Sequence, residues 1–387
     1  MSERFAIERV AIRNFRSILH SEVEIPEPLT YIVGPNGSGK TNFTDGLLFI
    51  RDGLKISLEN AVNNAGGVLS IVPAPARMPS TTELRIEWTT SWQSRGFYTI
   101  ELQFESNRTY SVAHEVCETT GADGRSSRFE VKFGEASGTP EILPAGACDR
   151  LYLVQASGLQ EFRSIYECLA GMQASDPVPV PWRTIPFRNR TDYEGFANRV
   201  MRLKESHPDR LRIIEEYMRA VLPSFRGFEV GLLEGDLPYL KFMEATHLEH
   251  PIGFSINNMS SGSVYLADLL IDLFSPPDPG KAYAPWTIEE PETGLHPGAI
   301  RVVRDALFEA SHFRQLIVTT HSPEFLDDER LSDRNILAAY RDATGSHISN
   351  LDAGTRRILR DNLYTAGELL RQGLLDLSEV HSAADRD

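Results

Sequence analysis

A glycine-rich loop, Gly34–Thr41, constrains this chain more than any other feature, because it matches the pattern GxxxxGK[ST] at every fixed position. The apolar run Leu29–Val33 before it is typical of a buried strand, and apolar residues recur at helical spacing after it, at Phe43, Leu47, Ile50 and Leu54. In such a loop the glycines let backbone N–H groups turn inward, and the positive end of the following helix points at a phosphate. A plain tight turn is the alternative, but the full match at a strand-to-helix junction favours a phosphate-binding loop.

The residues of this loop have different tasks in holding a nucleoside triphosphate. We expect Lys40 to reach the β- and γ-phosphates and the Thr41 hydroxyl to ligate Mg²⁺. The residues expected to bind the nucleotide are Gly34, Pro35, Asn36, Gly37, Ser38, Gly39, Lys40, Thr41 and Asn42. Taken alone, the loop predicts no more than the binding of a nucleoside triphosphate.

Two adjacent acids, Glu289 and Glu290, end the short apolar stretch that begins at Trp286. A site for a magnesium nucleotide needs one acid to hold the metal's water shell and another to orient the attacking water. Neighbouring residues at a strand tip can divide these roles, since their side chains point in different directions. A pair of acids alone is more often a solvated turn, so its value here comes from its place in the order of motifs.

Two further motifs complete that order. His321 follows the predicted strand Leu316–Thr320, and from a strand end a histidine can sense a γ-phosphate, although a lone histidine is more often structural. Upstream, Ser260 and Gly262 precede the apolar helix predicted at Val264–Phe274. They form a helix N-cap, and the N–H groups of such a cap can also be offered to a γ-phosphate by a second protomer.

The remaining sequence predicts one α/β core that is split by two insertions. Strand-like segments cover Phe5–Ile25, and a strand ending at Glu289 is followed by a helix with an apolar face of Ile300, Val303, Leu307 and Ala310. Apolar and polar residues alternate in three segments, which is typical of half-exposed antiparallel strands: Leu84–Trp88, Ile100–Phe104 and Phe129–Phe133. Two helices are predicted at Asp192–Glu205 and Asp209–Val221.

We therefore expect five segments. Residues 1–75 hold the N-terminal half of the core, 76–150 an antiparallel β subdomain, 151–250 a helical insertion, 251–350 the C-terminal half of the core, and 351–387 C-terminal helices and a polar tail. The proline-rich stretch Ala174–Pro186 is expected to be a rigid connector or ordered loop. The fold class is α/β, with a mixed, largely parallel core sheet.

Composition narrows the choice of partners and compartment. The formal net charge of −15 argues against a chain whose whole surface binds nucleic acid, although a local basic groove assembled in a dimer stays an alternative. Three scattered cysteines without metal spacing favour the reducing cytoplasm. The N-terminus lacks the apolar stretch of a signal peptide, and Asp268 and Asp272 interrupt the most apolar helix, so we expect no membrane span.

The phosphate-binding loop, Ser260–Ser263, Glu289–Glu292 and Thr320–Pro323 occur in the order found in ABC-type ATPases, and the chain resembles the RecF/SMC/OLD group of that class. Its opening, Asn14–Ser17, is similar to the opening of that group. The sequence Gly367–Gly373 resembles the end of its compact "predicted ATPase" members. The resemblance implies an ABC-type split head that dimerises around two ATP molecules, each held between one P-loop and the signature helix of the partner.

The resemblance also implies residue roles. Ser260 and Gly262 match the signature motif, and Thr293–His296 occupies the D-loop position. The implied catalytic residues are the base Glu290, the switch histidine His321 and Lys40, and the implied magnesium ligands are Thr41, Glu289 and Gln155. Gln155 is the candidate for the Q-loop because it follows a predicted strand, Leu151–Val154, and an ordinary polar strand end is the alternative.

Three departures from the family pattern stand out. Glu289 occupies the metal-binding position where transporter-type domains have Asp. Pro285 stands at the start of a strand that is less aliphatic than expected, which is the position where a strand tolerates proline. Ser261 and Tyr265 replace the Asp and Arg that compact relatives often carry, which bears on the strength of activation by the partner protomer.

Three functions from different classes agree with these features. The first is an ATPase of DNA maintenance, repair or anti-phage defence; the second is a regulatory subunit whose ATP state controls a separately encoded nuclease or toxin without binding DNA itself. The third and least supported is a transporter nucleotide-binding domain. The absence of sustained heptads excludes a long coiled-coil arm, and no acid cluster of a TOPRIM nuclease follows Leu351. Any nuclease activity is therefore expected from another chain.

Overall fold

The computed structural model describes residues 4–73, 80–105, 109–139, 146–175, 190–233, 237–246, 250–361 and 363–375. Most of the expected connector Ala174–Pro186 and the tail after Leu377 lie outside these ranges. The chain divides into two compact units. The core unit comprises Met1–Ala174, Pro279–Glu289 and Ser311–Asp387, and the signature unit comprises Ser175–Asp278 and Glu290–Ala310.

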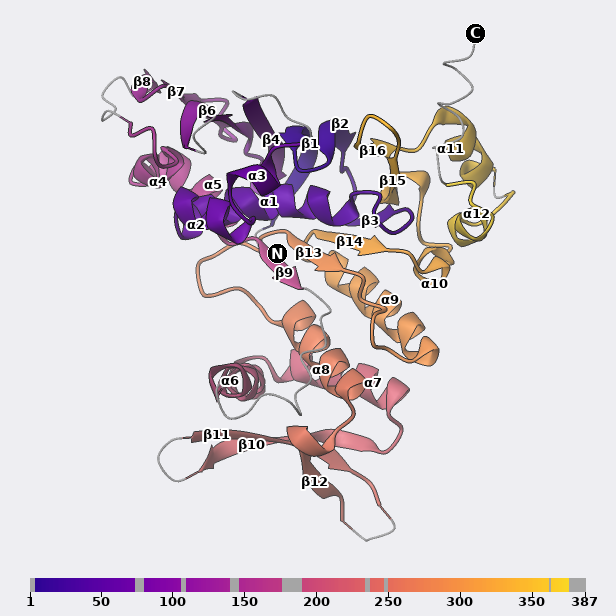
Figure 1. Ribbon diagram of the computed structural model, residues 1–387. Coiled ribbons are helices and arrows are strands. Elements are labelled where there is room, and N and C mark those ends of the chain that lie inside the picture. Colours follow the sequence, from indigo (N-terminus) through magenta and orange to yellow (C-terminus); the bar gives the residue numbers. More distant parts are fainter. Residues whose placement is uncertain are drawn as a thin grey trace. The chain divides into compact units, whose positions relative to one another are not determined.

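Within the described residues the core unit is built on a 13-stranded mixed sheet with the order β8-β7-β6-β5-β4-β1-β2-β16-β15-β3-β14-β13-β9. The predicted strands over Phe5–Ile25 are confirmed as the hairpin of β1 (Phe5–Phe15) and β2 (Ile18–Glu24). Its turn is tight, because Asn14 and Arg16 both have a φ of +52°. This hairpin joins the antiparallel and the mixed parts of the sheet (Figure 1).

The antiparallel part continues from β1 through five strands: β4 (Ser80–Thr90), β5 (Arg95–Phe104), β6 (Tyr110–Thr120), β7 (Ser126–Lys132) and β8 (Glu135–Thr139). The alternating segments predicted from the sequence are confirmed at β4, β5 and β7. Strand β6 was not predicted, because a register shift opposite Glu101 and Leu102 breaks the alternation and a charged residue, Glu115, is fully buried on it.

The mixed part of the sheet contains β3 (Leu29–Val33), β9 (Gln173–Ser175), β13 (Trp286–Glu289), β14 (Leu316–Thr320), β15 (Ile336–Arg341) and β16 (Ser346–Asn350). Strands β3, β14 and β13 are parallel neighbours. Their register pairs Thr320 with Val33 and Glu289 with Thr319. The residues that follow these strands are therefore brought to one edge of the sheet.

Helices cover the core-unit sheet and carry its apolar contacts. The long helix α1 (Lys40–Lys55) packs against β1 and α5 and buries the predicted face of Phe43, Leu47, Ile50 and Leu54 (Figure 1). The other helices of this unit are α2 (Leu58–Asn64), α3 (Val68–Ile71), α4 (Leu153–Ala156), α5 (Gln160–Ala170), α10 (Pro323–Leu326), α11 (Ala353–Arg360) and α12 (Ala366–Arg371).

The strand predicted at Leu151–Val154 is wrong, because the helical turn α4 occupies this place. The backbone N–H groups of Tyr152 and Leu153 donate to the buried carboxylate of Glu115, at 2.5 and 2.8 Å. Such bonds cap the start of a helix. The apolar run looked like a buried strand because the partner that caps the turn is 37 residues away in the chain.

The signature unit combines helices with a small antiparallel sheet. The predicted helices are confirmed as α6 (Arg190–Ser206) and α7 (Pro208–Val221), and α8 (Ser261–Phe274) starts three residues before its predicted beginning. Helix α9 (Pro297–Ser311) carries the predicted apolar face. The sheet consists of β10 (Phe225–Leu233), β11 (Leu237–Glu244) and β12 (Ile252–Ser255), and α6 and α7 pack against β11 and β10 (Figure 1).

The strands β10 and β11 correct the expectation of an entirely helical insertion over residues 151–250. Gly227, Gly231 and Pro238 interrupt the alternation that would have identified them. Gly227 has a φ of +147° at a register shift in this hairpin, a conformation that favours glycine. Among the described helices, none combines the length and the apolar character that crossing a bilayer requires.

Candidate functional site

The loop between β3 and α1 has the backbone of a phosphate cradle. Gly34, Gly37 and Gly39 all have positive φ values, of +156°, +78° and +106°. A Cβ at Gly34 would lie 2.0 Å from the Ala339 carbonyl oxygen, and one at Gly37 would meet nothing within 4 Å. The loop is therefore in close contact with β15 at Gly34 and faces open space at Gly37. A phosphate needs such open space to approach the backbone of the loop.

Lys40 lies across this loop. Its side chain is buried, and its Nζ donates to the carbonyl oxygens of Gly34 at 2.9 Å and Pro35 at 3.2 Å. Gly39, the N-cap of α1, has no side chain with which to cap the helix, so the first N–H groups of α1 are not capped by a residue at that position. The ammonium group of Lys40 and the N-terminus of α1 together make the loop suitable for binding an anion.

The loop is supported from behind by residues that sequence reasoning missed as parts of the site. Asn42 Nδ2 donates to Ser17 Oγ at 2.5 Å, and Ser17 Oγ donates to Ser346 Oγ at 2.7 Å. A Cβ at Gly39 would lie 2.5 Å from Ser346 Cβ, so the two segments are in direct contact. Ser17 belongs to the Asn14–Ser17 motif, which gave a signal, whereas nothing in the sequence marks Ser346.

Glu289 connects the end of β13 with the start of α1. Its carboxylate accepts hydrogen bonds from Thr41 Oγ1 at 3.1 Å and from Thr44 Oγ1 at 2.6 Å. Thr44 was not predicted, although its spacing of three residues from Thr41 places both hydroxyls on one helix face. The predicted pairing of Thr41 and Glu289 in one place is thus present in the structure.

His321 lies at the same sheet edge. It follows Thr320, which is paired with Val33, the residue directly before Gly34. The chain turns at His321, since the N–H of Ser322 donates to Thr320 Oγ1 at 3.0 Å, and the histidine side chain is exposed. The position fits a residue that contacts a ligand on the loop.

Glu290 follows Glu289 in a strained conformation. Its φ of +37° is left-handed, which is rare for a residue with a side chain and is often found at functional sites. The N–H of Thr293 donates to the Glu290 carbonyl oxygen at 2.9 Å, so the strained residue opens a turn.

The residues fit a magnesium nucleotide in their chemistry. Ser38 Oγ is buried and has no hydrogen-bond partner among the described residues, which leaves a polar group that a phosphate oxygen can satisfy. Thr41 and Glu289 offer oxygen ligands only, which suits Mg²⁺. The described residues contain no group of three or more His, Cys, Asp or Glu that could hold a metal. Few protein ligands are usual where phosphates and water complete the magnesium shell.

Ser260 and Gly262 lie at the start of α8 in the signature unit. Ser260 is the N-cap, and its hydroxyl accepts a hydrogen bond from the N–H of Ser263 at 3.2 Å. Gly262 faces the predicted D-loop, because a Cβ there would lie 2.9 Å from the Gly294 carbonyl oxygen. Ser260 is exposed, so the cap is open to solvent.

Gln155 differs from the other predicted site residues in its surroundings. It lies on the helical turn α4 with an exposed side chain, not at the end of a strand. A second glutamine, Gln173, is on β9 beside β13, but its Oε1 accepts from Arg314 at 3.0 Å. The role of Gln155 as a metal ligand stays a prediction.

Two protein-family models match the chain. The one described as "AAA ATPase domain" matches residues 6–108, and the one described as "AAA domain, putative AbiEii toxin, Type IV TA system" matches residues 165–327. Short segments also match two chromosome partition proteins Smc. The identity is 46% over 44 residues with the protein of Methanocaldococcus jannaschii and 42% over 45 residues with that of Methanococcus voltae, or 11% and 12% of this chain. The matched segments span only 4% of either relative.

Solved structures of Smc head domains are similar in fold. One, bound to the C-winged helix domain of ScpA, has a TM-score of 0.52 at 17% identity and covers 91% of this chain and 99% of its own. Another, with an extended coiled coil and bound to the C-terminal domain of ScpA derived from Pyrococcus furiosus, has a TM-score of 0.50 at 15% identity and covers 93% and 99%. At such identities the likeness concerns the fold, and it confirms the predicted α/β P-loop NTPase class.

The two ATPase-domain matches and the geometry of the loop and Glu289 define an ATPase of the ABC class. Within that class its fold is similar to that of Smc head domains. The predicted resemblance is confirmed at this level.

Proposed function

We propose that the chain binds Mg-ATP on the loop Gly34–Thr41 and cleaves it with residues that follow β13 and β14. The observation that carries this proposal is the Glu289 carboxylate, which accepts one hydrogen bond from Thr41 and one from Thr44. Since the Thr41 hydroxyl gives its proton to that carboxylate, the lone pairs of Thr41 Oγ1 are left for a cation. Thr41 and Glu289 would hold Mg²⁺, which would supply positive charge against the negative charge that develops on the phosphates.

The roles of the other residues follow from their positions. Lys40 holds the β- and γ-phosphates as a fixed positive charge at the start of α1. Glu290 orients the attacking water from its left-handed backbone position directly after Glu289. His321 contacts the γ-phosphate from the end of β14. Thr41 and Glu289 are the magnesium ligands in this proposal; Gln155 is kept as a third candidate.

The second half of each site comes from a partner protomer in this proposal. Ser260 and Gly262 would face the γ-phosphate bound by the other chain, so that two ATP molecules lie between two copies. The exposed N-cap of α8 supports this role, since a helix start offers N–H groups and a positive dipole end to an anion. Gly262 has no side chain, which permits a close approach of a phosphate.

For the biological role we propose DNA maintenance, DNA repair or anti-phage defence in the cytoplasm, as in OLD-like proteins. The alternative is a switch subunit that controls a separate effector without binding DNA. The net charge of −15 favours the alternative. We also keep the division at residues 1–75, 76–150, 151–250, 251–350 and 351–387 as a proposal.

The Glu290→Gln variant tests the dimer cycle. It keeps the shape of the side chain but cannot accept a proton, so we expect ATP binding to remain and hydrolysis to fall by about 100-fold or more. Because it stays in the ATP-bound state, the Glu290→Gln variant should have twice the monomer mass by light scattering in Mg-ATP. The exposed Glu329→Gln is the matched control and should behave as wild type. A Glu290→Gln protein that stays monomeric at saturating Mg-ATP would contradict the proposed dimer, in which two ATP molecules lie between two copies of the chain.

Affinity purification of the same trapped variant from its host distinguishes the two biological roles. A DNA-maintenance ATPase should retain nucleic acid that is released by nuclease treatment. A switch subunit should instead retain a protein at a fixed ratio, identified by mass spectrometry, with no nucleic acid in the eluate.

A further inference from the structure

The segment after His321 is held by the last helix that the structure describes. Only His321 and Ser322 separate β14 from α10, and α10 packs against α12. Helix α12 belongs to the motif Gly367–Gly373, for which the ATPase site has no use. Its contact with α10 raises the question of what the motif does for the residue at the end of β14.

The backbone contact between the two helices is close at Gly367. A Cβ at this position would lie 2.6 Å from the Pro323 carbonyl oxygen and 2.0 Å from Asp327 Oδ1. Leu369, two residues on, is buried with an exposed fraction of 1%. Because any other residue at position 367 would push α12 away from α10, glycine is required there by packing.

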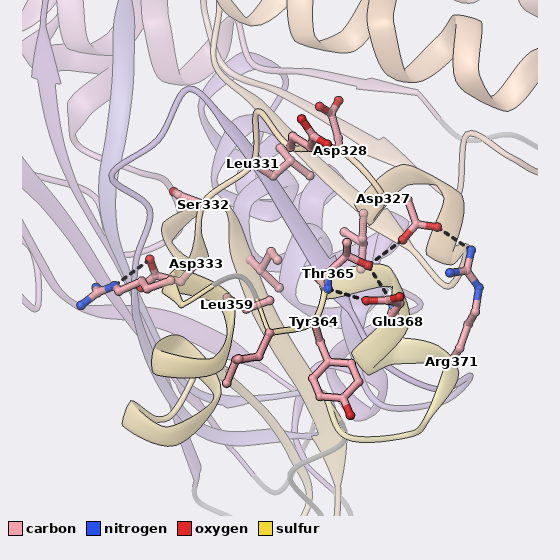
Figure 2. Close-up of a pocket in the computed structure, with 16 residues that line it drawn as sticks. Asp327, Asp328, Leu331, Ser332, Asp333, Leu359, Tyr364, Thr365, Glu368 and Arg371 are labelled. Atoms are coloured by element: carbon pink, nitrogen blue, oxygen red, sulfur yellow. Dashed lines mark hydrogen bonds and ion pairs between the residues drawn. The ribbon is translucent and has the colours of Figure 1, made fainter.

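Polar side chains fasten the same contact at Asp327, the C-cap of α10 (Figure 2). Thr365 Oγ1 donates to Asp327 Oδ1 at 2.9 Å, and Arg371 Nη2 donates to Asp327 Oδ2 at 2.5 Å. Thr365 is also the N-cap of α12 and forms a capping box with Glu368. Both ends of α12 are thus bound to one carboxylate that terminates α10.

The network extends to the residue beside His321. Arg371 lies 3.8 Å from a carboxylate oxygen of Glu324, on the first turn of α10. Ser322 Oγ donates to that carboxylate at 2.5 Å, and this bond lowers the pKa of Glu324 below its usual value. Arg371 therefore contacts the acid that anchors the side chain of the residue next to His321.

On its other side α10 packs against the strand that leads into the phosphate-binding loop. The rings of Phe325 and Tyr31 are 6.0 Å apart between centroids, and both side chains are fully buried. Tyr31 lies on β3, three residues before Gly34. Helix α10 therefore lies between the strand of the loop and α12, and it has fixed contacts with each.

We propose that α12 is a latch for the switch histidine, and that Arg371 is a positioning residue that holds α10, and with it His321, in the orientation needed for hydrolysis. The proposal rests on the role proposed above for His321 at the γ-phosphate. A pocket of about 960 Å³ opens beside Asp327, Thr365 and Arg371, so the latch has free space into which it can release (Figure 2). Binding of ATP by Lys40 does not depend on the latch.

A double-mutant cycle on ATP hydrolysis tests the latch. We expect Arg371→Ala to lower kcat by about five- to tenfold with little change in the affinity for ATP, since it disturbs the orientation of one catalytic group. His321→Ala should lower kcat further. If Arg371 acts through His321, the double variant should be no slower than His321→Ala alone. Arg371→Lys should recover part of the loss, because it keeps the charge at Asp327.

Arg357→Ala is the control. Arg357 lies on the neighbouring helix α11, its side chain is 84% exposed, and it pairs only with Asp361 in the contacts described, so this variant should hydrolyse ATP as wild type does. The latch is overturned if the losses from Arg371→Ala and His321→Ala multiply in the double variant, or if either single variant leaves kcat unchanged. The proposed ATP-bound dimer is tested separately, by the mass of Glu290→Gln in Mg-ATP. The proposal for Arg371 and the proposal for the dimer can therefore fail independently.

Discussion

The two units carry the two halves of the proposed site, and the halves are built differently. In the core unit, a hydrogen bond connects Thr41 with Glu289, two residues that are almost 250 positions apart in the chain. In the signature unit, the polar contacts of Ser260 go to Ser263, three residues away, and the helix start is exposed. One half-site is therefore assembled by the fold, and the other is a local structure presented at a surface.

This difference teaches how the work of the site is divided. Residues held by long-range hydrogen bonds are preorganised, so the core unit is expected to bind nucleotide without help. The exposed N-cap at Ser260 is proposed to contact only the nucleotide that another chain binds. It therefore gains its function only in the dimer. Dimer formation would then depend on ATP, since ATP is the ligand that both halves share.

The largest effects are expected from variants that remove one half-site each. Lys40→Ala should weaken ATP binding by about 100-fold or more, because it removes the charged contact to the phosphates. Ser260→Arg should leave ATP binding intact and abolish hydrolysis, because a large cation blocks the surface meant for the partner's γ-phosphate. Lys55→Ala, an exposed lysine at the end of α1, is the control for the first variant.

Mixing these two inactive proteins sharpens the comparison. In a dimer of one Lys40→Ala chain and one Ser260→Arg chain, one site contains both substitutions. The other site combines an intact phosphate-binding loop with an intact signature motif. Half of the dimers should be mixed and half of their sites active, so hydrolysis should return to about a quarter of the wild-type rate. If the equimolar mixture stays inactive at concentrations where wild type is dimeric, the halves do not meet between chains.

The sequence was sufficient for the phosphate-binding loop, for the helix start at Ser260 and for the parallel strands of the core, because local rules determine them. The loop, the strands β3, β13 and β14, and the N-cap at Ser260 each follow from residues within a few positions of one another. It was insufficient where distant residues decide. Helical turn α4 depends on Glu115 of β6, Ser346 supports the loop from β16, and Arg371 reaches back to Asp327.

The units also differ in how they handle buried charge. In the core unit, burial raises the pKa of Glu115 from 4.5 to about 7, although bonds from Tyr152, Leu153 and Tyr98 act in the opposite direction. Between these values the folded chain binds a proton that the unfolded chain does not. Stability from this group is therefore full below about pH 4.5 and falls as the pH rises to about 7.

A urea titration at several pH values checks this effect. Relative to Glu115→Gln, which resembles the protonated acid at every pH, the wild type should lose on the order of 3 kcal/mol of unfolding free energy between about pH 5 and pH 8. Glu101→Gln, on the adjacent strand β5, should leave the pH profile of wild type unchanged. Parallel profiles for wild type and Glu115→Gln would show that Glu115 keeps an ordinary pKa in the fold.

In the signature unit the corresponding charges are about one-third exposed, and the expected effect is smaller. Arg199 of α6 bonds to Asp268, at 2.5 Å, and to Asp272, which are four residues apart on α8. These are the acids that interrupt the apolar pattern of α8, and the arginine between them relieves their mutual repulsion. The side chains are about one-third exposed, so solvent screens the pairs.

We expect Arg199→Ala to cost about 1–2 kcal/mol of stability in the signature unit and to slow hydrolysis, because α8, the helix that carries the signature cap, loses a support. ATP binding to the monomer should not change, since the loop lies in the core unit. Arg202→Ala, which removes a longer and more exposed pair with Asp278 on the same helix, is the matched control and should have a weaker effect on both quantities. Weaker ATP binding by the Arg199→Ala monomer would mean that the two half-sites are coupled within one chain, and the division of work between the units would have to be abandoned.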